Sequence, residues 1–73
     1  MIARTPIDFG AALRRRRNEL QLTQQGVADV IGVNRRVIGR LEAGKDTVQL
    51  RIALEAARAV GLDIELRSRG GAS

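Results

Sequence analysis

Two adjacent guanidinium groups, Arg35 and Arg36, lie in a short segment whose cationic and apolar residues have helical spacing. A guanidinium has two parallel donors that match the O6 and N7 acceptors of guanine in the major groove of duplex DNA, so these two residues are the expected base readers. The same pair would also suit the solvated face of an amphipathic helix, and this alternative stays open. The other expected base contacts are Asn34, Val37, Gly39 and Arg40.

Single positions in and after this segment also carry alternatives. Val37 suits contact with a thymine methyl group or packing against the preceding helix. Gly39 costs about 1 kcal/mol of helix propensity relative to alanine, and it either permits close approach of the backbone to DNA or is a neutral residue. Arg40 suits a base or a phosphate, and Lys45, beyond the segment, suits a phosphate.

The composition argues against most other chemistry. The 73 residues include no Cys, His or Tyr, and serine occurs only at positions 68 and 73, so we expect no enzyme, no metal site and no cofactor. A net charge of +5, from 13 Lys and Arg against 8 Asp and Glu, favours an acidic partner. The single aromatic residue, Phe9, leaves no stacking platform for unpaired bases, so duplex DNA fits better than RNA.

Four helices are predicted to position these side chains, over residues 7–20, 24–31, 35–43 and 48–60. Their expected caps are Thr5, Thr23, Asn34 and Thr47, and their expected glycine stops include Gly32 and Gly44. The residues expected to face inward are Phe9, Ala12, Leu13, Leu20, Val27, Ala28, Ile31, Ile38, Leu41, Leu50, Ala53, Leu54, Ala57 and Val60. The second and third helices are separated by three residues only, which predicts a helix-turn-helix in an all-α domain.

Residues 62–67 change to an alternation of apolar and charged side chains, which is typical of a half-buried strand. Because no other strand is predicted, its expected partner is the same strand of a second copy, in a two-stranded antiparallel ribbon. The residues assigned to this homodimer contact are Leu62, Ile64 and Leu66. The domain is therefore placed at residues 5–67, followed by a disordered tail over 68–73.

A resemblance to a known family lies in residues 22–44, which read LTQQGVADVIGVNRRVIGRLEAG. This stretch resembles the lambda-repressor and Cro superfamily, also called the xenobiotic-response-element family, and residues 5–67 as a whole resemble a HipB-type antitoxin. The resemblance implies a repressor domain of four to five helices that binds palindromic operators and often restrains a partner toxin kinase. Gln24, at the first position of the second helix, is expected to contact a DNA phosphate, as the resemblance also implies, and a generic polar residue of the first turn is the alternative. Thr23 is expected mainly to cap that helix and secondarily to contact DNA.

The run from Arg14 to Arg17 cannot form one patch, because successive helical residues point about 100° apart. One or two of these arginines are expected to pair with acids. Glu42 is a suitable partner because the third helix ends near the first in the resembled family, and a surface pair of this kind contributes under about 1 kcal/mol. Arg16 stands where related domains often carry an apolar residue, so Leu20 is expected to complete the inner face.

Together these features predict a homodimeric repressor, and the resemblance further implies the antitoxin of a HipBA-like pair that regulates its own operon. The alternatives are a stand-alone regulator with no toxin partner and an antitoxin that acts mainly by inhibiting a HipA-like toxin kinase. No apolar stretch approaches the roughly 20 residues that span a bilayer, and residues 1–6 lack the apolar run of a secretory signal. We therefore expect a cytoplasmic, nucleoid-associated protein.

Overall fold

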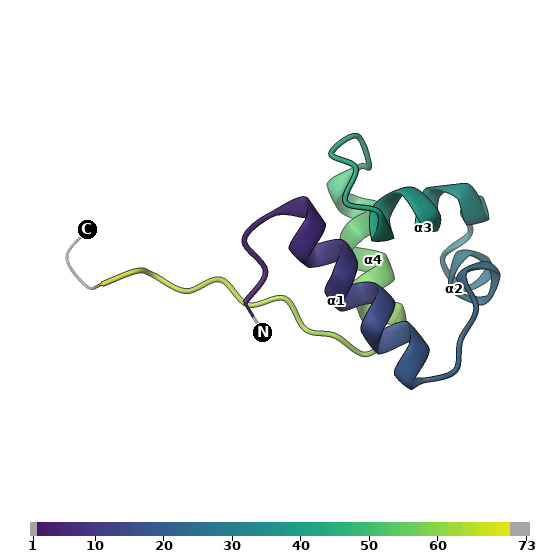
Figure 1. The fold of residues 1–73 in the computed structure, drawn as a ribbon, viewed down its shortest axis with the longest axis horizontal. Helices are drawn as coiled ribbons and strands as arrows, with labels where there is room; N and C mark the ends of the chain where they lie inside the picture. The colour runs from purple at the N-terminus through teal and green to yellow at the C-terminus, as the bar shows by residue number, and fades with distance from the viewer. Residues whose placement is uncertain (1, 71–73) are drawn as a thin grey trace.

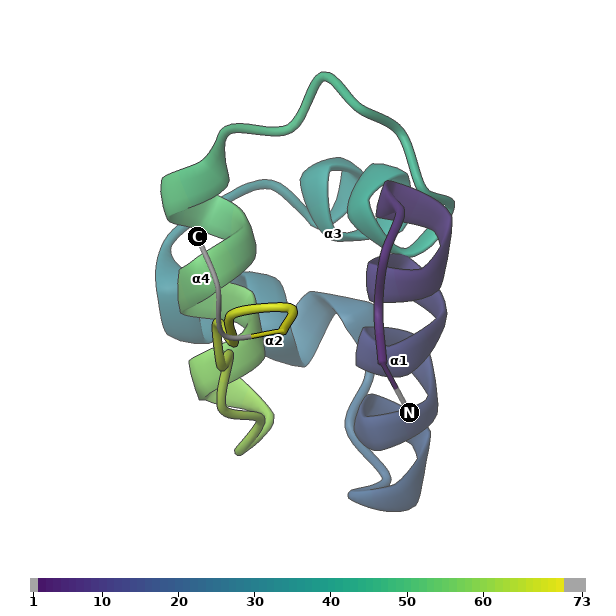
Figure 2. The same cartoon turned by 90° about the vertical axis from the view of Figure 1, so that its left-hand side faces the viewer.

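The computed structural model describes residues 2–70, which form four helices joined by short turns (Figure 1). Their bounds are Pro6–Glu19 for α1, Gln24–Ile31 for α2, Arg35–Glu42 for α3 and Leu50–Ala59 for α4. Helix α3 packs against α1 and α2, and α4 packs against α2. Figure 2 shows α1 and α4 on opposite sides of the molecule, with α2 and α3 between them. Over these residues the prediction of an all-α fold with four helices is confirmed.

The first three helices begin at the predicted caps. A side-chain oxygen of each of Thr5, Thr23 and Asn34 accepts a hydrogen bond from a backbone N–H two or three residues ahead, at 2.8–3.0 Å. Each cap satisfies one of the N–H groups that a helix start leaves without a partner. Gly32, with φ 74°, follows the end of α2 and lies two residues before the cap of α3. The tight turn predicted between these two helices is therefore present.

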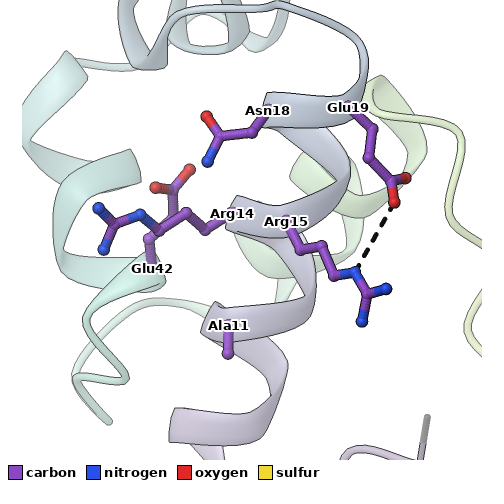
Figure 3. A pocket seen from close by; sticks show the side chains of 6 residues that line it. All are labelled: Ala11, Arg14, Arg15, Asn18, Glu19 and Glu42. Carbon is purple, nitrogen blue, oxygen red and sulfur yellow. Dashed lines mark ion pairs between the residues drawn. The ribbon is translucent and has the colours of Figure 1, made fainter.

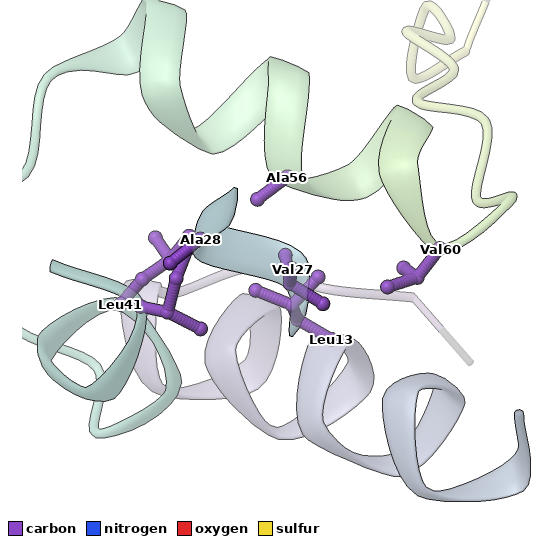
Figure 4. Close-up of a cluster of buried hydrophobic side chains, with 7 residues drawn as sticks. Leu13, Val27, Ala28, Leu41, Ala56 and Val60 are labelled. Atoms are coloured by element: carbon purple, nitrogen blue, oxygen red, sulfur yellow. The ribbon is translucent and has the colours of Figure 1, made fainter. Parts of the chain in front are cut away.

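A cluster of buried side chains joins the four helices (Figure 4). Its largest fully buried members are Leu13, Val27, Ile38 and Val60, each at most 1% exposed, and its other members are Ala28, Leu41 and Ala56. Helix α1 approaches α3 at Gly10, where an added Cβ would lie 2.3 Å from the backbone oxygen of Leu41. Only glycine permits this approach, so Gly10 sets how closely α1 crosses the end of α3.

The start of α4 differs from the prediction. The helix begins at Leu50, and its cap residue, Gln49, makes no side-chain cap bond. Thr47, the predicted cap, is wrong in that role, because its hydroxyl accepts a hydrogen bond from the guanidinium of Arg40. The loop between α3 and α4 is consequently longer than predicted.

Two of the predicted inward faces are also wrong in part. Leu50 and Leu54 of α4 are 72% and 40% exposed, and Leu20, just after α1, is exposed as well. The face of α4 that packs inward is formed by Ala53, Ala56, Ala57 and Val60. Small side chains allow α4 to lie close to α2, whereas the prediction placed Leu50 and Leu54 on the same inward face as these alanines.

Residues 62–70 leave α4 as an extended segment that runs away from the helices (Figure 1). Within residues 2–70 this segment has no strand partner. Leu62 packs against the core of its own chain, whereas Ile64 and Leu66 are 46% and 94% exposed. Pairing with a second copy stays a prediction, and positions 71–73 of the predicted tail lie outside the described residues. None of the helices described has the length and apolar content of a membrane span.

Candidate nucleic-acid interface

Helix α3 has one buried face and one exposed face. The buried face carries Ile38, Leu41 and Glu42. The exposed face, with the cap residue, carries Asn34, Arg35, Arg36 and Arg40, and the half-buried residues between the two faces are Val37 and Gly39. The residues predicted to contact bases are thus brought together on one short helix and its cap. The three arginines among them are exposed, so their guanidinium groups are accessible to a duplex.

A series of hydrogen bonds connects the exposed face of α3 to α1 and α2. Arg17 of α1 donates from Nε to Oε2 of Glu42 at 2.6 Å and from Nη2 to Oε1 at 3.1 Å. Gln24, the first residue of α2, donates from Nε2 to Oε1 of Glu42 at 3.1 Å, and its own Oε1 accepts from Nη1 of Arg35 at 3.0 Å. We call Arg17, Glu42, Gln24 and Arg35 the carboxylate network.

The ion pair in the carboxylate network is buried. The side chains of Arg17 and Glu42 are 11% and 3% exposed. The hydrogen bond to Glu42 raises the pKa of Arg17 above its ordinary value, burial opposes this, and the carboxylate charge raises it further. The prediction that Glu42 pairs with the arginine run is confirmed, but the expectation of a weak surface pair is wrong. Removal of one partner would leave an uncompensated buried charge, at a cost of about 3–5 kcal/mol.

The residues predicted to contact phosphates at the start of α2 have partners within the chain. Thr23 is the exposed cap of α2, and Gln24 is half-buried, with both the nitrogen and the oxygen of its side-chain amide engaged in the carboxylate network. Gln24 therefore holds Arg35, a role that sequence reasoning missed. Its partners are 11 and 18 positions away, and no short-range pattern connects residues at such separations.

Arg40 and Lys45 lie at and beyond the end of α3. Arg40 donates from Nη2 to the hydroxyl of Thr47, so the loop before α4 orients this guanidinium. Lys45 is exposed in the same loop, and its contact with a phosphate stays a prediction. The loop thus holds one guanidinium of α3 through Thr47.

Gly39 faces α2. A Cβ built on Gly39 would lie 3.6 Å from Oε1 of Gln24, an ordinary van der Waals contact. The side chain of Gln24 therefore occupies the space beside this glycine. Val37 is half-buried, which leaves part of its side chain accessible.

The arginines of α1 point in different directions, as predicted. Figure 3 shows Arg14 and Asn18 extending from α1 toward Glu42, while Arg15 turns away to pair with Glu19 at 3.7 Å. These side chains line an open hollow with Ala11. Among residues 2–70 no group of three acidic, histidine or cysteine side chains could hold a metal ion.

Comparison with known proteins matches these features to a family. A protein-family model described as a helix-turn-helix domain matches residues 8–70. The chain is also 40% identical over 67 residues to a protein of Sinorhizobium fredii (strain NBRC 101917 / NGR234), the uncharacterized HTH-type transcriptional regulator y4mF. That alignment covers 92% of this chain and 88% of the relative.

Two solved structures have the same fold. One is a HipB variant in complex with an O2 20mer and the other is HipB in complex with an O4 20mer. Each gives a TM-score of 0.86 at 20% identity and covers 96% of this chain, with 97% and 99% of the respective HipB chains covered. The predicted likeness to the HipB fold is confirmed. With the match over residues 8–70 and the 40% identical relative, the chain belongs to the helix-turn-helix family of transcriptional regulators.

Proposed function

We propose that the protein is a sequence-specific repressor that binds duplex DNA through α3. The observation that carries the proposal is the exposure of Arg35 and Arg36 on a helix whose opposite face is fixed by the core and the carboxylate network. A helix with such a face fits the major groove, where guanidinium groups recognise guanine. Membership in the helix-turn-helix family and the fold shared with HipB in its 20mer complexes support the same function.

Arg35 and Arg36 are assigned to guanine, and a bidentate contact of this kind gives roughly 1–3 kcal/mol of discrimination. One N–H of Arg35 is already held by Gln24, which limits the orientations available to its remaining donors. The remaining base contacts are assigned to Asn34, Val37, Gly39 and Arg40. The phosphate contacts are assigned to Thr23, Gln24 and Lys45, with Gln24 also holding Arg35.

The protein is proposed to act as a homodimer joined through residues 62–67. The apolar residues Leu50, Leu54, Ile64 and Leu66 are all at least 40% exposed, and the first three line one open groove between α4 and the C-terminal segment. A second copy would cover these side chains and pair with the extended backbone. The two copies of α3 would then lie about one DNA turn apart, roughly 34 Å.

The proposed biological role is autoregulation of a toxin–antitoxin operon, in the cytoplasm at the nucleoid, with a HipA-like toxin kinase as the second partner. The fold shared with HipB is the observation that favours this role. A stand-alone regulator without a toxin and an antitoxin that acts mainly by protein inhibition are the alternatives. Charge reversal at Arg35 and Arg36 separates the two activities, because it is expected to abolish operator binding and leave a toxin complex intact.

The DNA-binding proposal is tested by selecting bound sites from a random duplex pool. We expect two-fold symmetric sites with half-sites 10–10.5 base pairs apart. Arg35→Ala and Arg36→Ala should each relax preference at one base pair by about tenfold, while the exposed control Arg4→Ala should leave every preference unchanged. Equal weak binding to all duplexes, or a uniform loss with the α3 variants, would contradict the proposal.

A further inference from the structure

Arg16 is a half-buried cation of α1 whose partner lies at the far end of the domain sequence. Its Nε donates to the backbone oxygen of Val60 at 3.0 Å, across 44 positions of sequence, and its Nη1 lies 3.4 Å from Oε1 of Glu19. The guanidinium is therefore held at both ends, by a carboxylate of its own helix and by a carbonyl of another. A planar fork of donors suits such a bridge better than a flexible ammonium does.

The carbonyl that Arg16 binds lies at the C-terminal end of α4. Gly61, with φ 73°, turns the chain there, and the N–H of Leu62 donates to the oxygen of Ala57 at 2.8 Å. The last carbonyls of a helix lack partners within the helix and carry partial negative charge, so a cation at this point is favourable. Residues 62–67 leave the domain directly after this turn, which makes it the exit point of the proposed dimerisation segment.

The two ends that Arg16 connects have their main packing partners on different helices. Helix α1 packs mainly against α3, whereas α4 packs mainly against α2, and Figure 2 shows α1 and α4 on opposite sides of the molecule. The bond from Arg16 to Val60 thus ties the helix that supports α3 to the point where the C-terminal segment leaves. A shift at this point would change the direction of the segment relative to α3.

We infer that Arg16 is a positioning residue that sets the separation and rotation between the two copies of α3, and thereby the half-site spacing that the dimer accepts. The inference rests on the proposed DNA-binding homodimer. One base pair changes the distance between half-sites by about 3.4 Å and their relative rotation by about 34°. A small change in the exit direction, repeated in both subunits, is therefore enough to alter which spacing fits.

The experiment uses the full chain with duplexes in which the spacer of the selected operator is changed by one or two base pairs. We expect the parent protein to bind duplexes of one spacing about tenfold or more tightly than the others. A charge-assisted hydrogen bond contributes enough free energy for a difference in affinity of this size. In Arg16→Met that preference should fall to about threefold or less, with an unchanged sedimentation coefficient. The matched control is Arg15→Met, which removes an exposed partner of Glu19 and should keep the parent spacing profile.

Arg16→Lys serves as the second variant if Arg16→Met does not fold, as judged by circular dichroism. Its flexible ammonium should give an intermediate spacing preference. A parent spacing profile in the folded Met variant, or in the Lys variant where the Met variant is unfolded, would overturn the inference. A parent protein that is monomeric or has no spacing optimum would instead overturn the proposed function.

Discussion

The region around α3 and the region around the C-terminal segment differ in how many of their hydrogen-bond and packing partners one chain supplies. In the first, Glu42 accepts three hydrogen bonds from two helices and the carboxylate network extends to Arg35. In the second, Leu50 and Leu66 are largely exposed and the backbone of residues 62–67 lacks a strand partner within the described chain. Every buried side-chain nitrogen or oxygen in residues 2–70 has a hydrogen-bond partner. The region around α3 thus has its partners within one chain, whereas the C-terminal region leaves apolar side chains and extended backbone without partners in the described residues.

The largest effect is expected from removing the buried ion pair in the region around α3. Glu42→Ala would leave Arg17 buried without its anion, at a cost of about 3–5 kcal/mol of unfolding free energy. At the size of this domain such a loss lowers Tm by more than about 12 °C. Urea and thermal unfolding followed by circular dichroism measure both quantities.

The matched control for that substitution is Glu55→Ala. Glu55 pairs with Arg51 at 3.0 Å on the exposed side of α4, and exposed pairs of this spacing contribute about 0.3–0.5 kcal/mol. Equal losses for the two variants would mean that the buried ion pair has no special part in holding α3.

A second effect is expected from a substitution in the C-terminal segment. Ile64→Asp places a charge where a second copy is proposed to pack, so the protein should become monomeric and bind the symmetric operator about 100-fold more weakly. Sedimentation velocity and operator titration measure these changes, and circular dichroism should show unchanged helix content. Ser68→Asp, beyond the proposed strand, is the control. An unchanged sedimentation coefficient for Ile64→Asp would remove residues 62–67 from the interface.

The smallest effect concerns local strain in the turn between α1 and α2. Gln21, in the turn after α1, has φ 58°, a left-handed conformation that costs a non-glycine residue about 1 kcal/mol or more. Gln21→Gly should raise the unfolding free energy by roughly 0.5–1 kcal/mol, because relief of strain outweighs the added freedom of the unfolded chain. Gln25→Gly, in the first turn of α2, should lower it by about 1 kcal/mol, because glycine disfavours the helix and the hydrogen bond from Gln25 to Asp29 is lost. A loss of stability in both would show that the turn is not strained.

The parts of the fold that depend on neighbours in sequence could be predicted. The caps Thr5, Thr23 and Asn34 and the turn at Gly32 lie where expected, because capping and left-handed glycine are properties of a few adjacent residues. The cap of α4 failed because Thr47 has a competing partner in Arg40, from the preceding helix. Local signals are decisive only where tertiary contacts do not compete for the same atoms.

The parts of the candidate site that depend on distant residues could be predicted only in outline. The exposed residues of α3 follow from helical spacing, and the pairing of Glu42 with the arginine run was anticipated from the resemblance. The burial of that pair, the bond from Gln24 to Arg35 and the bond from Arg16 to Val60 join elements that only the folded chain brings together. Homodimer contacts lie one step further, since they require a second subunit.

Sharing one carboxylate among three helices also limits how the protein can change its target. Any roll of α3 about its own axis would separate Glu42 from Arg17 and Gln24 together, and the buried charges make that motion costly. Related helix-turn-helix regulators that keep these three residues should therefore diversify by exchanging the outward side chains at positions 35, 36 and 40. The angle at which α3 docks on the double helix should stay the same in these relatives, while the preferred base pairs change.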